Sequence, residues 1–358
     1  MVELKQQDSD ERYEESARKM KISNELILRC SSRHLLDPRK GEGDEAILSR
    51  ITHLYLQEQH IRNIENLENC ENLLALYLYD NRIERIENLE GLSRLNCLYL
   101  QGNRIKTLDN LNTLEQLTVL NISRNAITKL ENLKGLANLR ELYIEYQKIP
   151  DDAPALEVDP ESIEAIAGSL QVLSVSGNRL KTLQAFRPLR CLQHLQAEEN
   201  HILDLTELVE TAGNWAEIRH LRLSSNPVCR QRKYRDSLVV ACLELEDLDS
   251  RPITSSYRNF LLNWQQCRAL QELKKESYTL LKPFLQEQIH NRQLTPASSR
   301  QSSVSSSQSE TATAGTRTRS RSIQRKSSQG KSLSRARSLQ EVRNKIVKKF
   351  TKGNKAKE

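Results

Sequence analysis

No window of the 358-residue sequence approaches the roughly 18 to 20 apolar residues that a helix needs to span a bilayer. The N-terminal segment MVELKQQDSDERYEESARKMK is polar from its first residues, so we expect neither a signal peptide nor a transmembrane segment. The seven cysteines are odd in number, widely scattered and without CxxC or Cys/His ligand spacing. We therefore expect reduced, mostly buried thiols in a cytosolic or nuclear protein.

Sequence motifs of common enzymes are absent as well. The chain has neither GxxxxGKS/T nor a GxGxxG that follows a strand, and it has no GxSxG or HExxH. Carboxylates are scattered along the sequence, but no pair of them is favoured by its spacing. We expect a protein that is not an enzyme and that has no catalytic residue, no cofactor and no metal site.

The formal net charge of +7 is unevenly distributed along the chain. Residues 296–358 contain 16 Lys/Arg and 3 Asp/Glu, a charge of +13, whereas residues 1–295 contain 38 and 44, a charge of −6. Net charge informs association rather than fold. The basicity that would favour an anionic partner therefore belongs to the C-terminal tail alone.

A repeat dominates the sequence between residues 51 and 228. Four copies begin 22 residues apart: LLALYLYDNRI (73–83), LNCLYLQGNRI (95–105), LTVLNISRNAI (117–127) and LRELYIEYQKI (139–149). A weaker copy, ITHLYLQEQHI (51–61), precedes them, and LQVLSVSGNRL (170–180), LQHLQAEENHI (192–202) and IRHLRLSSNPV (218–228) follow at spacings of 31, 22 and 26. The pattern is that of eight leucine-rich repeats, for which the expected fold class is an α/β solenoid.

Each repeat predicts one short strand followed by one polar ladder residue. The central L-x-L is typical of a strand with one buried face, and the Asn that follows can satisfy backbone groups where the chain turns. The ladder consists of Asn81, Asn103, Asn125, Asn178, Asn200 and Asn226, with Gln59 and Gln147 as substitutes. We expect an arc of parallel strands on the concave face, with turns or 3₁₀ segments on the convex face.

The segments that flank the repeats predict caps, because the ends of a repeat array must be covered. The expected divisions are an N-terminal extension and helical cap (1–50), the repeats (51–228), a C-terminal cap (229–254), a helical extension (255–295) and a disordered basic tail (296–358). An amphipathic helix is expected around 234–243, and Pro283 should break or kink the later helix. In the expanded repeat, Asp159 before Pro160 predicts a convex helix, whose contact with a partner stays open.

Equivalent positions of stacked parallel strands form columns. The column between the strand leucines reads Tyr55, Tyr77, Tyr99, Asn121, Tyr143, Ser174, Gln196 and Arg222, and the next reads Gln57, Tyr79, Gln101, Ser123, Glu145, Ser176, Glu198 and Ser224. Tyrosine is a frequent interface hot spot, although it also suits strands that have no partner. The predicted partner-binding surface comprises Tyr55, Tyr77, Tyr79, Tyr99, Glu141, Tyr143, Glu145, Tyr146, Glu198 and Arg222.

The expected partner of this surface is a folded protein with a basic or mixed patch, bound by a monomer. Nucleic acid is disfavoured because residues 51–226 contain 17 basic and 25 acidic residues. His194 and His220 occupy equivalent positions of adjacent repeats and should face each other at about 5 Å. A metal would need further ligands, so two solvated histidines are the favoured interpretation.

Three motifs support a more specific comparison: LYLYDN (76–81), LEVDPESIEAIAGSL (156–170) and NPVCRQRKYRDSL (226–238). Together with the E-N-L linkers and the 22-residue spacing, they resemble the leucine-rich-repeat regulators of protein phosphatase 1 and their axonemal and centrosomal relatives. The resemblance covers about residues 20–265 and implies that the concave face binds the phosphatase catalytic subunit. The matching positions are Tyr77, Tyr79, Tyr99, Glu141, Tyr143, Glu145 and Glu198. It also implies a cytoplasmic location at the cytoskeleton, the centrosome or another microtubule-organising centre.

The C-terminal tail has a composition of its own. Residues 296–338 hold 15 serines in 43 positions and almost no apolar residues, which predicts disorder. Basic residues precede Ser322, Ser327 and Ser338, which are candidate phosphorylation sites whose modification would offset the positive charge. Residues 339–358 form a possible basic helix for microtubules or acidic membranes, and a solvated basic terminus is the alternative.

Two functions are compatible with these patterns. The first is a non-enzymatic regulator or adaptor that binds protein phosphatase 1 through its repeats at microtubule-organising structures. The second is a centrosomal or axonemal scaffold that binds tubulin or microtubules without regulating a phosphatase. The common docking peptide of this phosphatase is not cleanly present, since Val347–Phe350 has one residue too many. Binding to the phosphatase would therefore use the repeat surface, and the sequence leaves open whether it activates or inhibits.

Overall fold

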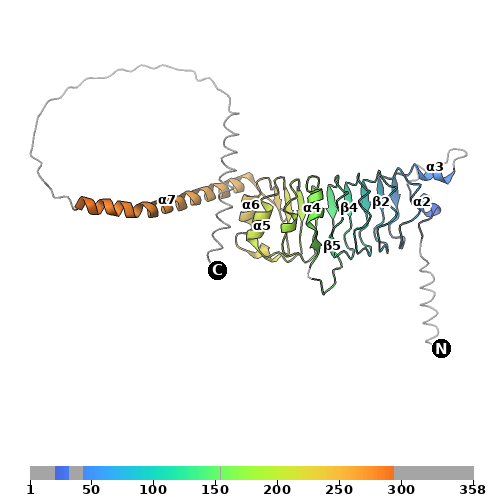
Figure 1. Cartoon of the computed structure of the whole chain (residues 1–358), viewed down its shortest axis with the longest axis horizontal. Helices are drawn as coiled ribbons and strands as arrows, with labels where there is room; N and C mark the ends of the chain where they lie inside the picture. The colour runs from blue at the N-terminus through green and yellow to red at the C-terminus, as the bar shows by residue number, and fades with distance from the viewer. Residues whose placement is uncertain (1–20, 32–42, 154, 294–358) are drawn as a thin grey trace, which may run out of the picture. The chain divides into compact units, whose positions relative to one another are not determined.

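The computed structural model describes residues 21–31, 43–153 and 155–293. The chain divides into two compact units, one up to Leu262 and one from Asn263. The first unit is a solenoid in which short strands stack side by side along its length (Figure 1). The α/β solenoid that the repeat predicts is confirmed in the described part of the chain.

Ten strands form one sheet in the order β1-β2-β3-β4-β6-β8-β9-β10-β11-β12. They are β1 (His53–Tyr55), β2 (Ala75–Tyr77), β3 (Cys97–Tyr99), β4 (Val119–Asn121), β6 (Glu141–Tyr143), β8 (Val172–Ser174), β9 (His194–Gln196), β10 (His220–Arg222), β11 (Asp247–Leu248) and β12 (Arg251–Pro252). All neighbours are parallel except β11 and β12, which are antiparallel. The register places the strand leucines opposite one another, so that Leu54, Leu76 and Leu98 are consecutive partners.

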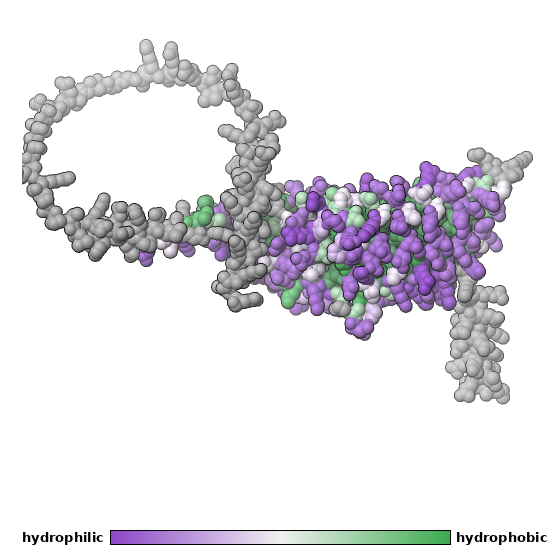
Figure 2. All heavy atoms as spheres, in the orientation of Figure 1, coloured by the Kyte–Doolittle hydropathy of each residue, from purple (hydrophilic) through white to green (hydrophobic). Residues whose placement is uncertain are grey.

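A continuous apolar core lies behind the sheet. Within one repeat, Leu98, Leu100, Ile105 and Leu108 are all completely buried, and the same positions are buried in the neighbouring repeats. Each fully buried leucine or isoleucine side chain contributes about 1.5–3 kcal/mol relative to an exposed one. Hydrophilic side chains cover most of the visible surface of the solenoid (Figure 2). Stacking of the repeats, rather than any single repeat, therefore provides the stability.

The predicted asparagine ladder joins consecutive repeats. Asn103 is completely buried, and its Oδ1 accepts a hydrogen bond from the backbone N–H of Ile83 at 3.0 Å. Its Nδ2 donates to the carbonyl oxygens of Leu78 and Leu100, each at 2.9 Å. Gln147 acts in the same way, because its Oε1 accepts from Ile127 N–H and its Nε2 donates to the Ile122 carbonyl. Buried backbone groups at each turn are thereby satisfied.

A second ladder, which the sequence reasoning missed, follows the E-N-L linkers. Asn66, Asn88, Asn110 and Asn132 all have left-handed backbones, with φ of 58°, 57°, 60° and 62°. The Nδ2 atoms of Asn88 and Asn110 donate to the carbonyl oxygens of Ile64 and Ile86, one repeat earlier, at 2.6 and 2.7 Å. Asparagine tolerates this conformation better than most residues, which explains its recurrence in the linkers.

Helices cover both ends of the array. At the N-terminal end, α2 (Asn24–Cys30) buries Leu26 and Ile27, and α3 (Asp44–Leu48) buries Ile47 and Leu48. At the other end, α6 (Tyr234–Ala241) buries Leu238 and Val239. Arg235 of α6 donates to the carbonyl oxygens of Leu248, Arg251 and Pro252, and so attaches the helix to the last two strands. These contacts close the core at each end.

The linkers outside the sheet carry short elements. They are β5 (Lys129–Leu130), β7 (Glu157–Val158), α4 (Pro160–Ile166), η2 (Gln184–Phe186), α5 (Leu205–Ala212) and η3 (Pro227–Arg230), with β5 and β7 paired in parallel. The helix expected in the expanded repeat is α4, and the carboxylate of its N-cap residue Asp159 accepts from the N–H of Ser162 at 2.9 Å. Short turns fill the same place in the preceding repeats.

The last described element is α7 (Ser255–Gln293). Of the break or kink expected at Pro283, the break is wrong, because the helix continues through that residue, and the kink stays a prediction. A proline in a helix interior removes one hydrogen bond and favours a bend, but neighbouring turns can maintain the helix. In the second unit, Arg268 pairs with Glu272 at 3.2 Å and lies over the ring of Trp264. None of the described helices is both long and apolar enough for a membrane crossing.

Candidate partner-binding surface on the open face of the sheet

The open face of the sheet is the side that points away from the core. The strand register aligns on it the column Tyr55, Tyr77, Tyr99, Asn121, Tyr143, Ser174, Gln196 and Arg222, as the repeat spacing predicts. Most of these side chains are partly exposed, although Ser174 is buried. Residues far apart in the sequence thus form one continuous surface, on which Tyr79, Glu145 and Glu198 lie two residues beyond the tyrosine column.

Three tyrosines at the N-terminal end of this column form a stack. The ring centroids of Tyr55 and Tyr77 are 4.8 Å apart and those of Tyr77 and Tyr99 are 4.9 Å apart, with interplanar angles of 12° and 4°. The spacing equals that of neighbouring strands, so the sheet itself sets the distance between the rings. Partial burial, together with the neighbouring phenols, raises the pKa of Tyr77, and the hydroxyl therefore stays protonated at neutral pH.

The three hydroxyls of the stack have no hydrogen-bond partner among the described residues. In contrast, the hydroxyls of Tyr143 and Tyr146 each donate a hydrogen bond to a glutamate. Tyr143 donates to Glu141 at 2.8 Å. Burial and this glutamate raise the pKa of Tyr143. The hydroxyls of the stack are therefore free donors at the surface.

Carboxylates occupy the C-terminal half of the open face. Glu141 is held by the Tyr143 hydroxyl, and Glu145 accepts a hydrogen bond from the buried hydroxyl of Ser174. The N–H of Glu198 donates to Ser176 Oγ at 3.1 Å, and Arg222 at the next strand is exposed. We call Glu141, Glu145, Glu198 and Arg222 the charged half of the face. Hydroxyl donors orient two of its carboxylates before any partner arrives.

Tyr146 lies at the rim of the open face rather than in a strand. Its backbone is left-handed, with φ of 48°, and its hydroxyl donates to Glu199 at 3.2 Å. Every equivalent position of the eight repeats has a positive φ: Glu58, Asp80, Gly102, Arg124, Tyr146, Gly177, Glu199 and Ser225. Only two of these eight residues are glycines, so the residue types do not indicate the shared conformation.

The two histidines on the open face stack on each other. The ring centroids of His194 and His220 are 4.5 Å apart with an interplanar angle of 15°, close to the predicted distance. Burial lowers the pKa of His194, and the positive charges of His220 and Arg219 lower it further. No group of three or more potential metal ligands occurs in the described part of the chain. The pair consists of two neighbouring imidazole rings on adjacent strands.

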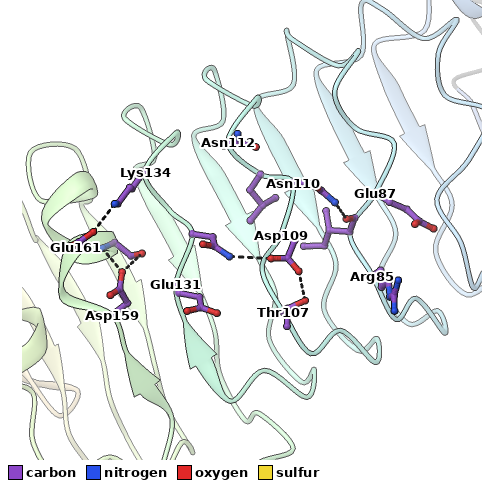
Figure 3. Close-up of a pocket in the computed structure, with 14 residues that line it drawn as sticks. Arg85, Glu87, Thr107, Asp109, Asn110, Asn112, Glu131, Lys134, Asp159 and Glu161 are labelled. Carbon is purple, nitrogen blue, oxygen red and sulfur yellow. Dashed lines mark hydrogen bonds and ion pairs between the residues drawn. The ribbon is translucent and has the colours of Figure 1, made fainter.

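A polar groove of about 970 Å³ lies away from the open face, among the linkers and beside α4 (Figure 3). Two of its interactions are an ion pair of Lys134 with Glu161 at 2.6 Å and a hydrogen bond that Asn132 donates to Asp109 at 3.1 Å. Hydrogen bonds from the side chain and backbone of Ser162 lower the pKa of Asp159.

Comparison with known proteins identifies the architecture. The family model described as Leucine Rich repeats (2 copies) matches residues 93–135. The fold is a leucine-rich-repeat solenoid. Such solenoids present extended surfaces that bind proteins, which indicates a protein partner for this chain.

Three bacterial proteins are among the solved structures to which this chain is similar. Internalin C2 of Listeria monocytogenes str. 4b F2365 is 22% identical, with a TM-score of 0.46, over 56% of this chain and 84% of that one. Internalin F of the same strain is 18% identical, with a TM-score of 0.46, over 63% and 76%. A leucine-rich-repeat protein of Leptospira interrogans is 20% identical, with a TM-score of 0.44, over 57% and 56%.

The candidate phosphorylation sites Ser322, Ser327 and Ser338, and the possible basic helix at 339–358, lie outside the described residues. The ten predicted partner-binding residues are all described. Nine of them lie on the open face, and Tyr146 lies at its rim.

Proposed function

We propose that this protein is a non-enzymatic adaptor whose open face binds the catalytic subunit of protein phosphatase 1. The proposal is supported by the resemblance of residues 20–265 to protein phosphatase 1 regulatory subunit 42 and its relatives. By the same resemblance, the adaptor acts in the cytoplasm at microtubule-organising structures such as the centrosome. The repeat surface takes the place of the common docking peptide, which the sequence does not cleanly contain.

The observation that carries the proposal is the orientation of carboxylates in the charged half. Glu141 and Glu145 each accept a hydrogen bond from a neighbouring hydroxyl, so their positions are set before binding. Carboxylates held in this way lose little conformational entropy when a basic side chain of a partner arrives. Complementary charge also speeds the encounter of two proteins and selects the partner.

The size of the face suits a folded partner. Eight strands at about 4.8 Å give a surface roughly 35 Å long. A standard protein interface of about 1,600 Å² fits on such a surface. The partly exposed tyrosines supply large rings at low entropy cost, and the carboxylates supply charge, as interface hot spots require.

A direct test uses the full-length protein and the purified phosphatase catalytic subunit. The double variant Tyr77→Ala with Tyr143→Ala removes one ring from each half of the face and should abolish capture of the phosphatase. Asn69→Ala with Asn112→Ala is the matched control, because both asparagines are exposed in linkers away from the open face. Circular dichroism verifies that both double variants stay folded. Equal capture by the wild type and the tyrosine variant would refute the proposal.

A second candidate function rests on the charge of the tail. Residues 296–358 carry a formal charge of +13, which suits the acidic surface of tubulin. A scaffold of this kind would bind microtubules without regulating a phosphatase. Removal of residues 296–358 should then eliminate co-sedimentation with microtubules while phosphatase capture persists. Retained co-sedimentation would exclude the tail as the microtubule-binding segment.

A further inference from the structure

The open face changes character between its fourth and fifth strands. In each of the strands β1 to β4, three residues face the open side: the first and third residues of the strand and the residue two positions after the third. They are His53, Tyr55, Gln57, Ala75, Tyr77, Tyr79, Cys97, Tyr99, Gln101, Val119, Asn121 and Ser123. None of these is Asp, Glu, Lys or Arg. The charged residues of the face begin at Glu141 in β6. The tyrosine stack thus belongs to an uncharged half, which is suited to a segment of partner that is itself uncharged.

The stacking of the rings limits what they can bind. Tyr77 has a neighbouring ring on each face, whereas Tyr55, which is 40% exposed, and Tyr99 each have one stacked neighbour. Contact of a partner's cation with a ring face requires an accessible face, so this mode is unavailable at Tyr77. The stack instead offers ring edges and hydroxyl groups. Its ligand must make apolar contacts with the edges and accept hydrogen bonds.

The hydroxyls set the chemistry of the ligand. Tyr55, Tyr77 and Tyr99 each have a hydroxyl without a partner among the described residues, so the row carries three free donors. A proline-rich segment matches this row, because proline has a carbonyl acceptor and no N–H donor. In the polyproline II conformation the carbonyl groups make no internal hydrogen bonds and remain available.

The spacing of the row also matches that conformation. Polyproline II has three residues per turn and a rise of about 3.1 Å, so equivalent carbonyls recur about every 9.3 Å. The steps of 4.8 and 4.9 Å place the outer two rings, Tyr55 and Tyr99, at most about 9.7 Å apart. The two outer rings are therefore spaced by about one turn of such a segment. Polyproline II segments are bound by aromatic side chains in several families of recognition domains.

We propose that the Tyr55–Tyr77–Tyr99 stack binds a proline-rich segment of a partner protein in the polyproline II conformation. The segment runs along the stack, across the strands, and accepts hydrogen bonds from Tyr55 and Tyr99. The inference deepens the proposed function and rests on it in one respect only, that the open face is where partners bind. It assigns the uncharged half of that face to an extended segment.

Fluorescence anisotropy with a labelled decaproline peptide and the full-length protein tests the proposal. A glycine-serine peptide of the same length is the control ligand. Tyr55→Phe with Tyr99→Phe keeps both rings but removes the two outer hydroxyls, and it should weaken decaproline binding about tenfold. Tyr257→Phe is the matched control variant, because it removes a hydroxyl that donates to Asp236 of α6 and not to a group of the open face. Decaproline binding should be unchanged in this control.

The outcomes separate this proposal from the phosphatase proposal. Failure of decaproline to bind the wild type, equal binding of the glycine-serine peptide, or an equal loss in Tyr257→Phe overturns the assignment. If any of these occurs while the phosphatase is still captured, only the proline-rich assignment fails. If decaproline binds through the stack and the phosphatase is not captured, only the phosphatase proposal fails.

Discussion

The ring of Tyr146 lies directly against Gly177, so that a Cβ atom added to this glycine would stand 2.2 Å from Cδ1 of the ring. Gly177 has φ of +68°, a conformation that residues with a side chain rarely adopt. The absence of a side chain lets Tyr146 cross the next repeat and donate its hydroxyl to Glu199 in the repeat beyond. The side chain of Tyr146 thus connects three consecutive repeats, which contain Tyr146, Gly177 and Glu199.

Gly177→Ala should destabilise the protein by about 1–3 kcal/mol, because the new methyl group meets the ring and the backbone conformation is strained. Urea unfolding measures the change. When Gly177→Ala is introduced into the Tyr146→Ala variant, the new methyl group no longer meets the ring. The further loss in the free energy of unfolding should then be smaller, since only the strain of the backbone remains. Additive losses in the double variant would contradict the contact.

Asn125→Ala should destabilise the solenoid by about 1–3 kcal/mol. The Oδ1 of Asn125 accepts from the N–H of Ile105, and its Nδ2 donates to the Leu100 and Ile122 carbonyls, all in a completely buried environment. Alanine would leave the Ile105 N–H without its acceptor. Asn112→Ala is the control, since Asn112 is exposed. A similar loss of the free energy of unfolding in both variants would argue against the ladder.

The periodicity of the sequence predicted the features that arise from repetition. A leucine at a fixed repeat position has the same neighbours in every repeat, so the register of Leu76 with Leu98 and of Tyr77 with Tyr99 follows from the 22-residue spacing. The same reasoning anticipated the contact of His194 with His220. The helix after Asp159 was also predictable, because capping and the following proline are local signals.

Features that depend on single side chains were not predictable in this way. Nothing in the sequence indicates that Ser174 holds Glu145, because the two come from different repeats on either side of the insertion. The positive φ that recurs at one position of every repeat could not be predicted, because residues as different as Arg124 and Tyr146 occupy that position. The helix also continues through Pro283, although a proline within a helix is a local signal for its end.

The stability of the protein should fall as the pH decreases below neutrality, in part because of His194. Burial, His220 and Arg219 hold the pKa of His194 below its usual value near 6.5, whereas Glu141 and Glu246 oppose the shift. Between the lowered pKa and 6.5 the unfolded chain binds more protons than the folded protein, so lowering the pH favours unfolding. Above pH 6.5 this contribution to stability is complete.

Urea midpoints measured between pH 7.5 and pH 5.5 provide the check. His194→Gln should show a smaller decrease across this range than the wild type. His201→Gln, which changes an exposed histidine, should show the same decrease as the wild type. A decrease of the same size in all three proteins would mean that His194 is not responsible.

Photo-crosslinking to the purified phosphatase catalytic subunit tests most directly whether a protein partner binds the open face. The photoreactive residue p-benzoylphenylalanine is placed at Tyr143, in the middle of the open face, or at Asn112, which is exposed in a linker. If the partner binds the open face, a crosslinked complex forms from position 143 and none forms from position 112. Crosslinking from position 112 alone, or from neither position, would contradict binding at the open face.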